Sequence, residues 1–169
     1  EAHYSVPMTG AVINTINIRL DPHTIAYILD HSDAKLFIMD TQFSPTIKKA
    51  LELVSKKIPI IDIVDDQAQL KEGEGERLGH STYEEFLELG DINYQWKKPK
   101  DEWQAISLSY TSGTTGQPKG VVYHHRGSYL MSMGSVVAWN MSNNLSYLYT
   151  VPMFHCNGWG YPWTLALLH

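Results

Sequence analysis

The sequence predicts an α/β fold with mostly parallel sheets, layered αβαβα. Three observations support this prediction. Short apolar, β-branched runs alternate with segments of helical periodicity, which is typical of parallel α/β layering. Hydrophobic residues make up 43% of the 169 residues, enough for a buried core. Residues that favour helix starts precede several of the helical segments.

The first part of the chain shows this alternation most clearly. Residues 11–16 are apolar and β-branched, which favours a strand. Asp21 and Pro22 form a helix start, because Asp can cap and Pro is tolerated in the first turn. A short buried strand is expected at residues 35–40.

The pattern then repeats. Ser44 and Pro45 are expected to open a second helix, and residues 58–64 form the next apolar strand. Residues 65–80 have the composition of a solvated surface loop.

A capping box is predicted next. Ser81 and Glu84 have its spacing, so a helix is expected to open there. Residues 91–103 read as a polar linker, and residues 105–110 as a strand.

The last part of the chain is expected to be helical at two places. The first helix covers much of residues 126–139, and the second lies in the apolar tail. Between them, residues 140–144 predict a turn and residues 146–151 a strand.

Composition excludes several classes of protein. The 13 basic and 18 acidic side chains give a net charge of −5, unlike the basic stripe of a nucleic-acid-binding protein. A single cysteine, Cys156, rules out an intramolecular disulfide. No apolar run approaches the ~18–20 residues of a membrane span, and no signal peptide is recognisable at the start.

The segment from Thr111 to Gly120 has the composition of a phosphate-binding loop. Its glycines permit close approach of the backbone to a ligand, and its hydroxyls and Lys119 add donors and a cation. The loop is expected to pass from a strand into a helix, which would add backbone N–H donors at the edge of a sheet. The P-loop of NTPases is excluded, because Lys119 follows a proline and precedes a glycine. The dinucleotide fingerprint fails on glycine spacing. A flexible Gly/Ser/Thr linker is the remaining alternative.

The sequence from Tyr110 to Val121 closely resembles the signature loop of the adenylate-forming superfamily. Val151 to His155 resembles that family's second motif. The flanking residues 122–127 and 154–159 look most like fatty acyl-CoA ligases of bacteria and the related plant acyl-activating enzymes. The resemblance extends over nearly the whole chain.

This resemblance implies a reaction and its ligands. The family joins a carboxylic acid to ATP, releases pyrophosphate, and transfers the acyl group to coenzyme A, with Mg²⁺ bridging the phosphates. No metal-binding residue is assigned to this chain. The expected nucleotide-binding residues are Thr111, Ser112, Gly113, Thr114, Thr115, Gly116 and Lys119.

The resemblance also implies catalytic and acid-binding residues. Lys119 and His155 are the expected catalytic residues. Phe154, Asn157, Gly158 and Trp159 are candidates for the acid pocket, although core packing explains the aromatic residues almost as well. His125 is expected to cap or pack at a helix start, and Cys156 to pack rather than react.

We expect residues 1–169 to be an incomplete N-terminal AMP-binding domain that lacks the small C-terminal domain. It comprises a first α/β portion, residues 1–104, and a portion with the phosphate loop and acid site, residues 105–169. The expected function is that of a fatty acyl-CoA ligase. An aryl or short-chain acid ligase and an inactive nucleotide-binding scaffold are the alternatives. A cytoplasmic location is expected, or a peroxisomal one for a plant protein.

Overall fold

The computed structural model describes residues 1–111, 116–155 and 160–168. The chain divides into two compact units. Unit 1 comprises residues 1–17 and 95–169, and unit 2 comprises residues 18–94. Both units combine helices with parallel strands, so the predicted α/β class is confirmed.

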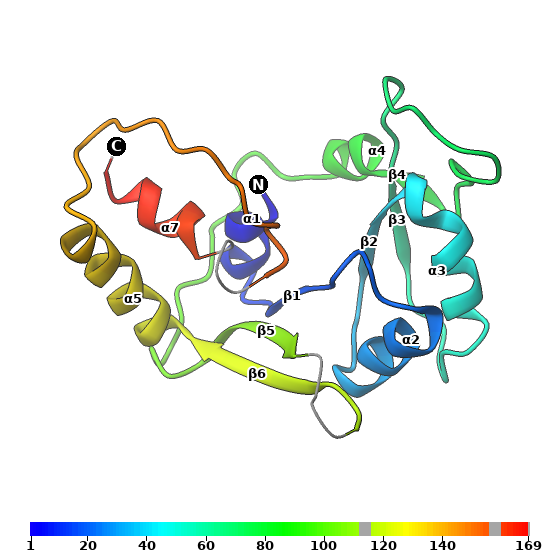
Figure 1. Cartoon of the computed structure of the whole chain (residues 1–169), viewed down its shortest axis with the longest axis horizontal. Helices are drawn as coiled ribbons and strands as arrows, with labels where there is room; N and C mark the ends of the chain where they lie inside the picture. The colour runs from blue at the N-terminus through cyan, green and yellow to red at the C-terminus, as the bar shows by residue number, and fades with distance from the viewer. Residues whose placement is uncertain (112–115, 156–159, 169) are drawn as a thin grey trace. The chain divides into compact units, whose positions relative to one another are not determined.

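Unit 2 is built around a sheet of three parallel strands in the order β2-β3-β4. Figure 1 shows α2 and α3 beside this sheet, in blue and cyan. The elements of unit 2 are α2 (Pro22–His31), β2 (Phe37–Asp40), the 3-10 helix η1 (Thr41–Phe43), α3 (Ser44–Leu51), β3 (Ile60–Ile63), β4 (Ser81–Thr82) and α4 (Tyr83–Glu88).

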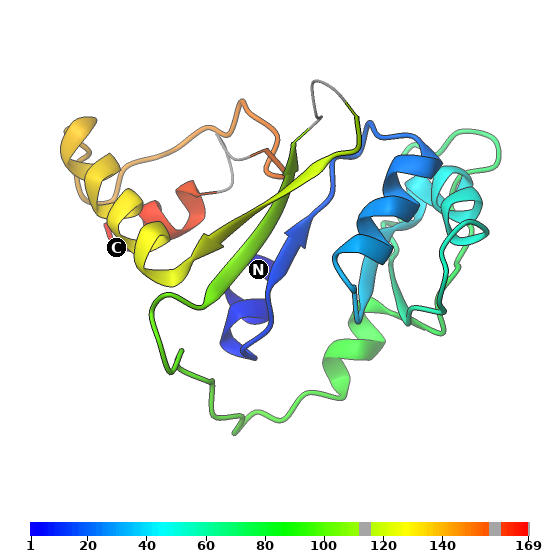
Figure 2. The same cartoon turned by 90° about the horizontal axis from the view of Figure 1, so that it is seen from below.

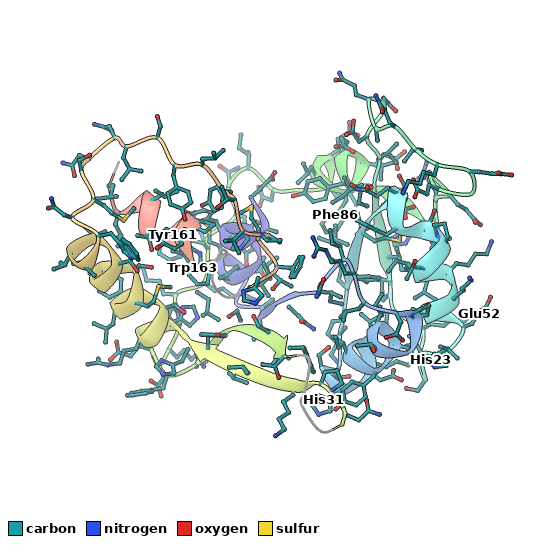
Figure 3. The ribbon with its side chains drawn as sticks, in the orientation of Figure 1. His23, His31, Glu52, Phe86, Tyr161 and Trp163 are labelled. Carbon is teal, nitrogen blue, oxygen red and sulfur yellow. The ribbon has the colours of Figure 1, made fainter. Side chains whose placement is uncertain are left out.

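The start of α2 forms as the sequence predicts. The Asp21 carboxylate accepts hydrogen bonds from the backbone N–H groups of His23 and Thr24 at 3.0 and 3.1 Å, and Pro22 occupies the first helical position. On the inner face of the helix, Ile28 and Leu29 are almost completely buried. Figure 3 labels His23 and His31 near the two ends of this helix.

The predicted capping box of Ser81 and Glu84 is wrong by one residue. The box is formed by Thr82, whose hydroxyl accepts from Glu85 N–H at 3.2 Å, while the Glu85 carboxylate accepts from Thr82 N–H at 2.7 Å. The helix begins at Tyr83, so the last residue of β4, Thr82, is its N-cap, and Ser81 lies one residue too early.

Unit 1 contains a second sheet of three strands, in the order β1-β5-β6. β1 runs parallel to β5, and β6 runs antiparallel to β5 (Figure 2). Helix α5 continues directly from β6. The elements of unit 1 are α1 (Ala2–Met8), β1 (Ile13–Thr15), β5 (Ala105–Thr111), β6 (Lys119–His124), α5 (His125–Ala138) and α7 (Tyr161–Ala166).

Two predictions for unit 1 need correction. The phosphate loop does not pass from a strand into a helix, because β6 follows it and only then does α5 begin. Residues 146–151 form no strand, since none of the strands in the described part of the chain pairs with them. The turn at residues 140–144 is present, with positive φ angles at Asn140 and Asn144.

The predicted division of the chain at residue 104 remains a prediction. Ile13 and Thr15 of β1 pair with Ser107 and Ser109 of β5, so residues 1–17 fold with the segment after residue 95. Among the described residues, no helix is long and apolar enough to cross a membrane.

Candidate functional site

The candidate site lies where the β5–β6 hairpin opens. Thr111 ends β5, Lys119 begins β6, and the two residues are direct partners across the hairpin. Both are exposed. The antiparallel pairing therefore places the Lys119 side chain at the mouth of the predicted phosphate loop, across from the first hydroxyl of that loop.

Of the two glycines expected to bind the nucleotide, Gly113 and Gly116, the structure describes Gly116. Its φ of +157° is a conformation that residues with a Cβ atom rarely adopt, and the residue is exposed. Ser112, Gly113, Thr114 and Thr115 lie outside the described residues. Their expected roles in phosphate binding stay predictions.

The second motif reaches the same end of the sheet through β1. The Thr15 hydroxyl at the end of β1 donates a hydrogen bond of 3.1 Å to the Phe154 carbonyl. Thr15 is also the direct partner of Ser109, close to the end of β5. Because β1 and β5 are parallel, the phosphate-loop motif and the second motif lie at the same edge of the sheet.

His155 follows this anchored residue and is exposed. Its N–H donates to the Pro152 carbonyl at 3.0 Å, which closes a turn over the Pro-Met-Phe segment. The structure thus brings His155 and Lys119 to one sheet edge, and their catalytic roles stay predictions. Asn157, Gly158 and Trp159, like Cys156, lie outside the described residues.

Thr15 is a site residue that the sequence did not identify. The only local signal is a Thr at the end of a short β-branched run, which is common in strands of every kind. The contact with Phe154 joins residues that are 139 positions apart, so it becomes visible only in the folded chain.

The segment after the second motif is held by α1. The Tyr4 hydroxyl donates to the Pro162 carbonyl at 2.5 Å, and the Trp163 indole N–H donates to the His3 carbonyl at 3.0 Å. Figure 3 labels Tyr161 and Trp163 on α7, above α5 and beside α1. These bonds fix the helix that follows residues 156–159 against the N-terminal helix.

Two cavities lie beside α5 and α7. One, of about 260 Å³, is lined by Ile106, His125, Ser128, Tyr129, Ser132, Trp163 and Leu167. The other, of about 290 Å³, is lined by Trp139, Met141, Tyr147 and Tyr161. Neither includes Lys119, Phe154 or His155 in its lining. Burial lowers the pKa of His125, which favours its neutral form.

The start of α5 is capped by His124, whereas the sequence proposed His125 for capping or packing. His124 Nδ1 accepts a hydrogen bond from Gly127 N–H at 2.9 Å. His125 is the first helical residue, partly buried, and its N–H donates to the Gln104 carbonyl at 3.1 Å. Packing is therefore the part of the prediction that applies to His125.

In the described part of the chain, no three His, Cys, Asp or Glu residues are grouped as a metal site. The donor set at the hairpin mouth, a hydroxyl and an ammonium group, fits phosphate oxygens directly.

The fold defines an α/β domain in which Thr111 and Lys119 are partners at the mouth of a hairpin. The family model for AMP-binding enzymes matches residues 1–169. The chain therefore belongs to the AMP-binding enzyme family, and the predicted resemblance is confirmed.

Several relatives are named as CoA ligases. The peroxisomal acetate/butyrate–CoA ligase of Arabidopsis thaliana is 46% identical over 99% of this chain. The trans-cinnamate:CoA ligase of Petunia hybrida, also named peroxisomal, is 43% identical over 98% of it. This chain spans 31% of the length of each of these two relatives.

Solved structures show the same fold. A long-chain-fatty-acid–CoA ligase from Archaeoglobus fulgidus matches with a TM-score of 0.78 at 22% identity, covering 99% of this chain and 30% of that one. The anthranilate–CoA ligase AuaEII, solved with anthranoyl-AMP, matches with a TM-score of 0.66 at 25% identity, covering 78% of this chain and 24% of that one.

Proposed function

We propose that the protein containing this chain is an AMP-forming acid–thiol ligase. A carboxylate oxygen attacks the α-phosphorus of ATP, and the bond to the β-phosphate oxygen breaks, which gives an acyl-adenylate and pyrophosphate. The thiolate of coenzyme A then attacks the acyl carbon and AMP leaves. The observation that supports this proposal is the meeting of the Thr111–Lys119 hairpin mouth and the His155 motif at one sheet edge.

In this proposal, Lys119 acts by neutralising charge. Adenylation brings an anionic acid against an anionic phosphate, so positioning and electrostatic stabilisation must supply most of the catalysis. An exposed ammonium group fixed at the first position of β6 can approach the phosphates without being buried first. The loop N–H groups add hydrogen bonds to the phosphate oxygens. Mg²⁺ supplies further neutralisation when it is bound with ATP.

His155 is proposed to donate a hydrogen bond at the reacting carboxylate or α-phosphate. Its backbone is held by the turn to Pro152, and the neighbouring carbonyl by Thr15, so the side chain is presented from a fixed backbone. One ring nitrogen of this exposed imidazole can donate a hydrogen bond to a carboxylate or phosphate oxygen.

For the acid, we propose a short aliphatic carboxylic acid ahead of a long-chain fatty acid. The names of three relatives support this choice: acetate/butyrate, acetate and 2-methylpropanoate CoA ligases, which are 46%, 47% and 41% identical to this chain. A trans-cinnamate ligase at 43% identity keeps an aryl acid as the second candidate. Two of these relatives are named peroxisomal, so we propose the peroxisome as well as the cytoplasm for the location.

The test is carboxylate-dependent ATP–pyrophosphate exchange by the full-length protein, with a panel of short, long and aryl acids. Lys119→Ala is expected to slow exchange by about 100-fold, the usual effect of losing one charge-stabilising donor, with the order of acids unchanged. Lys100→Ala is the matched control, because Lys100 is exposed in the same unit and precedes β5, whose opposite end carries Thr111.

Each possible result has a clear meaning. Exchange that depends on an acid, with Lys119→Ala slow and Lys100→Ala normal, supports the ligase and the role of Lys119. Equal pyrophosphate exchange in the wild type, Lys119→Ala and Lys100→Ala would show that Lys119 does not act at the site. If a stably folded full-length protein binds ATP but shows no exchange with any acid, the inactive nucleotide-binding scaffold replaces the ligase.

A further inference from the structure

Next to the mouth of the hairpin lies an unusual residue pair, Tyr110 of β5 and Gly120 of β6. The two are direct partners, one position inside the Thr111–Lys119 pair. Glycine is a poor strand residue because it has no side chain to pack and loses much conformational freedom. The hairpin is therefore expected to be weakest at the place where it must hold Lys119 in register.

Side chains from β5 fill the space that Gly120 leaves. A Cβ atom placed on Gly120 would lie 3.0 Å from Leu108 Cδ1, and 3.4 and 3.5 Å from Cζ and Cε1 of Tyr110. Cζ and Cε1 belong to the distal part of the ring. The ring of Tyr110 thus reaches across to the neighbouring strand and covers the backbone of Gly120.

We propose that Tyr110 is a positioning residue for the phosphate loop. Its ring occupies the space above Gly120 and holds the last two pairs of the hairpin together, which keeps Lys119 across from Thr111. An aromatic ring laid over a glycine of the adjacent strand is a known device for stabilising such a pair. The consequence for ligation rests on the proposed function, whereas the consequence for the hairpin does not.

Two explanations of Gly120 predict opposite results for one substitution. If only strand propensity matters, Gly120→Val strengthens β6, because β-branched residues favour strands. If the side chain of Leu108 and the ring of Tyr110 need the space, the side chain of Val displaces them and loosens the mouth of the hairpin. The sign of the effect therefore separates the two explanations.

The first measurement is hydrogen–deuterium exchange of residues 119–122 in the full-length protein. Gly120→Val and Tyr110→Ala are expected to raise exchange by roughly two- to fivefold, the range of a single cross-strand pair. Tyr110→Phe keeps the ring and should leave exchange as in the wild type. Val122→Ala is the matched control: Val122 lies in the same strand, is 60% exposed, and pairs with Leu108 one step further from the mouth.

The second measurement is the kinetic split in ATP–pyrophosphate exchange. Gly120→Val and Tyr110→Ala should raise the KM for ATP by roughly two- to fivefold and leave the KM for the acid unchanged, because only the phosphate grip is loosened. In the Gly120→Val background, Tyr110→Ala should add little, because one contact cannot be lost twice.

The outcomes separate this inference from the proposed function. Unchanged or slower hydrogen exchange in Gly120→Val overturns the positioning role of Tyr110, whether or not the protein is a ligase. Faster hydrogen exchange in a wild-type protein that lacks pyrophosphate exchange supports the positioning role and rejects the ligase. An equal rise in both KM values overturns the claim that the pair acts on the phosphate loop alone.

Discussion

The two units treat their buried polar groups differently. In unit 2, Asp62 is completely buried, and its carboxylate accepts hydrogen bonds from Leu78 N–H at 3.2 Å and Gly79 N–H at 2.9 Å. Ser44, also completely buried, accepts from Glu76 N–H at 3.1 Å. Asp62 thus fastens the long loop after β3 to the sheet, and Ser44 fastens it to α3.

In unit 1, several buried hydroxyls have no such partner among the described residues. They belong to Ser107, Ser109, Ser128 and Ser132. The polar residues of the candidate site, Thr111, Lys119 and His155, are instead exposed. The buried polar groups of unit 2 thus hold its backbone, whereas the polar residues of the candidate site in unit 1 are exposed at the sheet edge, which fits a supporting region and a region that binds ligand.

The largest expected effect comes from Asp62 and tests whether the buried polar groups of unit 2 hold its fold. Asp62→Ala leaves two partly buried N–H groups without their acceptor and removes the carboxylate that lies 3.8 Å from Arg77 Nε. We expect a loss of about 3 kcal/mol in the opening free energy of unit 2, since hydrogen bonds to a buried charge are strong. Hydrogen–deuterium exchange of residues 60–63 in the full-length protein measures it.

Asp66→Ala is the control for this change, because Asp66 is exposed in the following loop. It should alter the opening free energy by less than about 0.5 kcal/mol. Pyrophosphate exchange per folded molecule should be unaffected in both variants if unit 2 only supports the fold. A large drop in the turnover of folded Asp62→Ala protein would show that the separation of roles is wrong.

A smaller effect is expected in unit 1, at the N-terminus of α5, which is capped by His124. A Cβ atom on Gly127 would lie 2.8 Å from Cε1 of the capping His124 ring, whereas a Cβ on Gly134 of the same helix would meet nothing within 4 Å. Gly127→Ala therefore displaces the cap, and Gly134→Ala only gains helix propensity. We expect the second variant to be more stable by about 1–2 kcal/mol.

Hydrogen–deuterium exchange of the α5 amides in the two variants measures this difference in stability. Both changes replace Gly by Ala in one helix, so the gain in propensity is similar and the contrast reports the cap. Equal protection of α5 in the two variants would mean that His124 contributes nothing to the helix start.

The sequence predicted the elements whose local signals agree with their tertiary partners. Asp21 and Pro22 marked the start of α2 correctly. At residues 81–85, by contrast, both Ser81 and Thr82 are followed three positions later by Glu, so two capping boxes fit the pattern. The point where β4 ends decides between them: the strand runs through Thr82 and the helix begins at Tyr83, and the local sequence does not mark this boundary.

Long-range pairing also explains the errors around the site. β6 begins between Pro118 and Gly120, two turn-favouring residues, and becomes a strand because β5 provides a partner along its length. Residues 146–151 have high strand propensity but no partner strand among the described residues; Tyr147 instead stacks on Tyr161 at 4.8 Å. The residue types at the site were predictable, and their meeting through Thr15 and Phe154 was not.

The smallest expected effect tests whether unit 2 also gains from its surface charges. Hydrogen bonding to Lys35, and then to Lys56, lowers the pKa of Asp33 from 3.8 to about 2. Because the pKa in the folded state is the lower one, this carboxylate stabilises the fold above about pH 4 and loses that contribution as the pH falls towards about 2. Asp33→Asn removes the charge and keeps a residue that tolerates the φ of 53°. The wild type should therefore melt slightly above the variant at about pH 5, with the difference shrinking on acidification and in high salt, as for other exposed ion pairs.

Asp66→Asn should show no such dependence on pH, and a constant difference between wild type and Asp33→Asn over this window would mean that the two lysines do not stabilise the folded carboxylate.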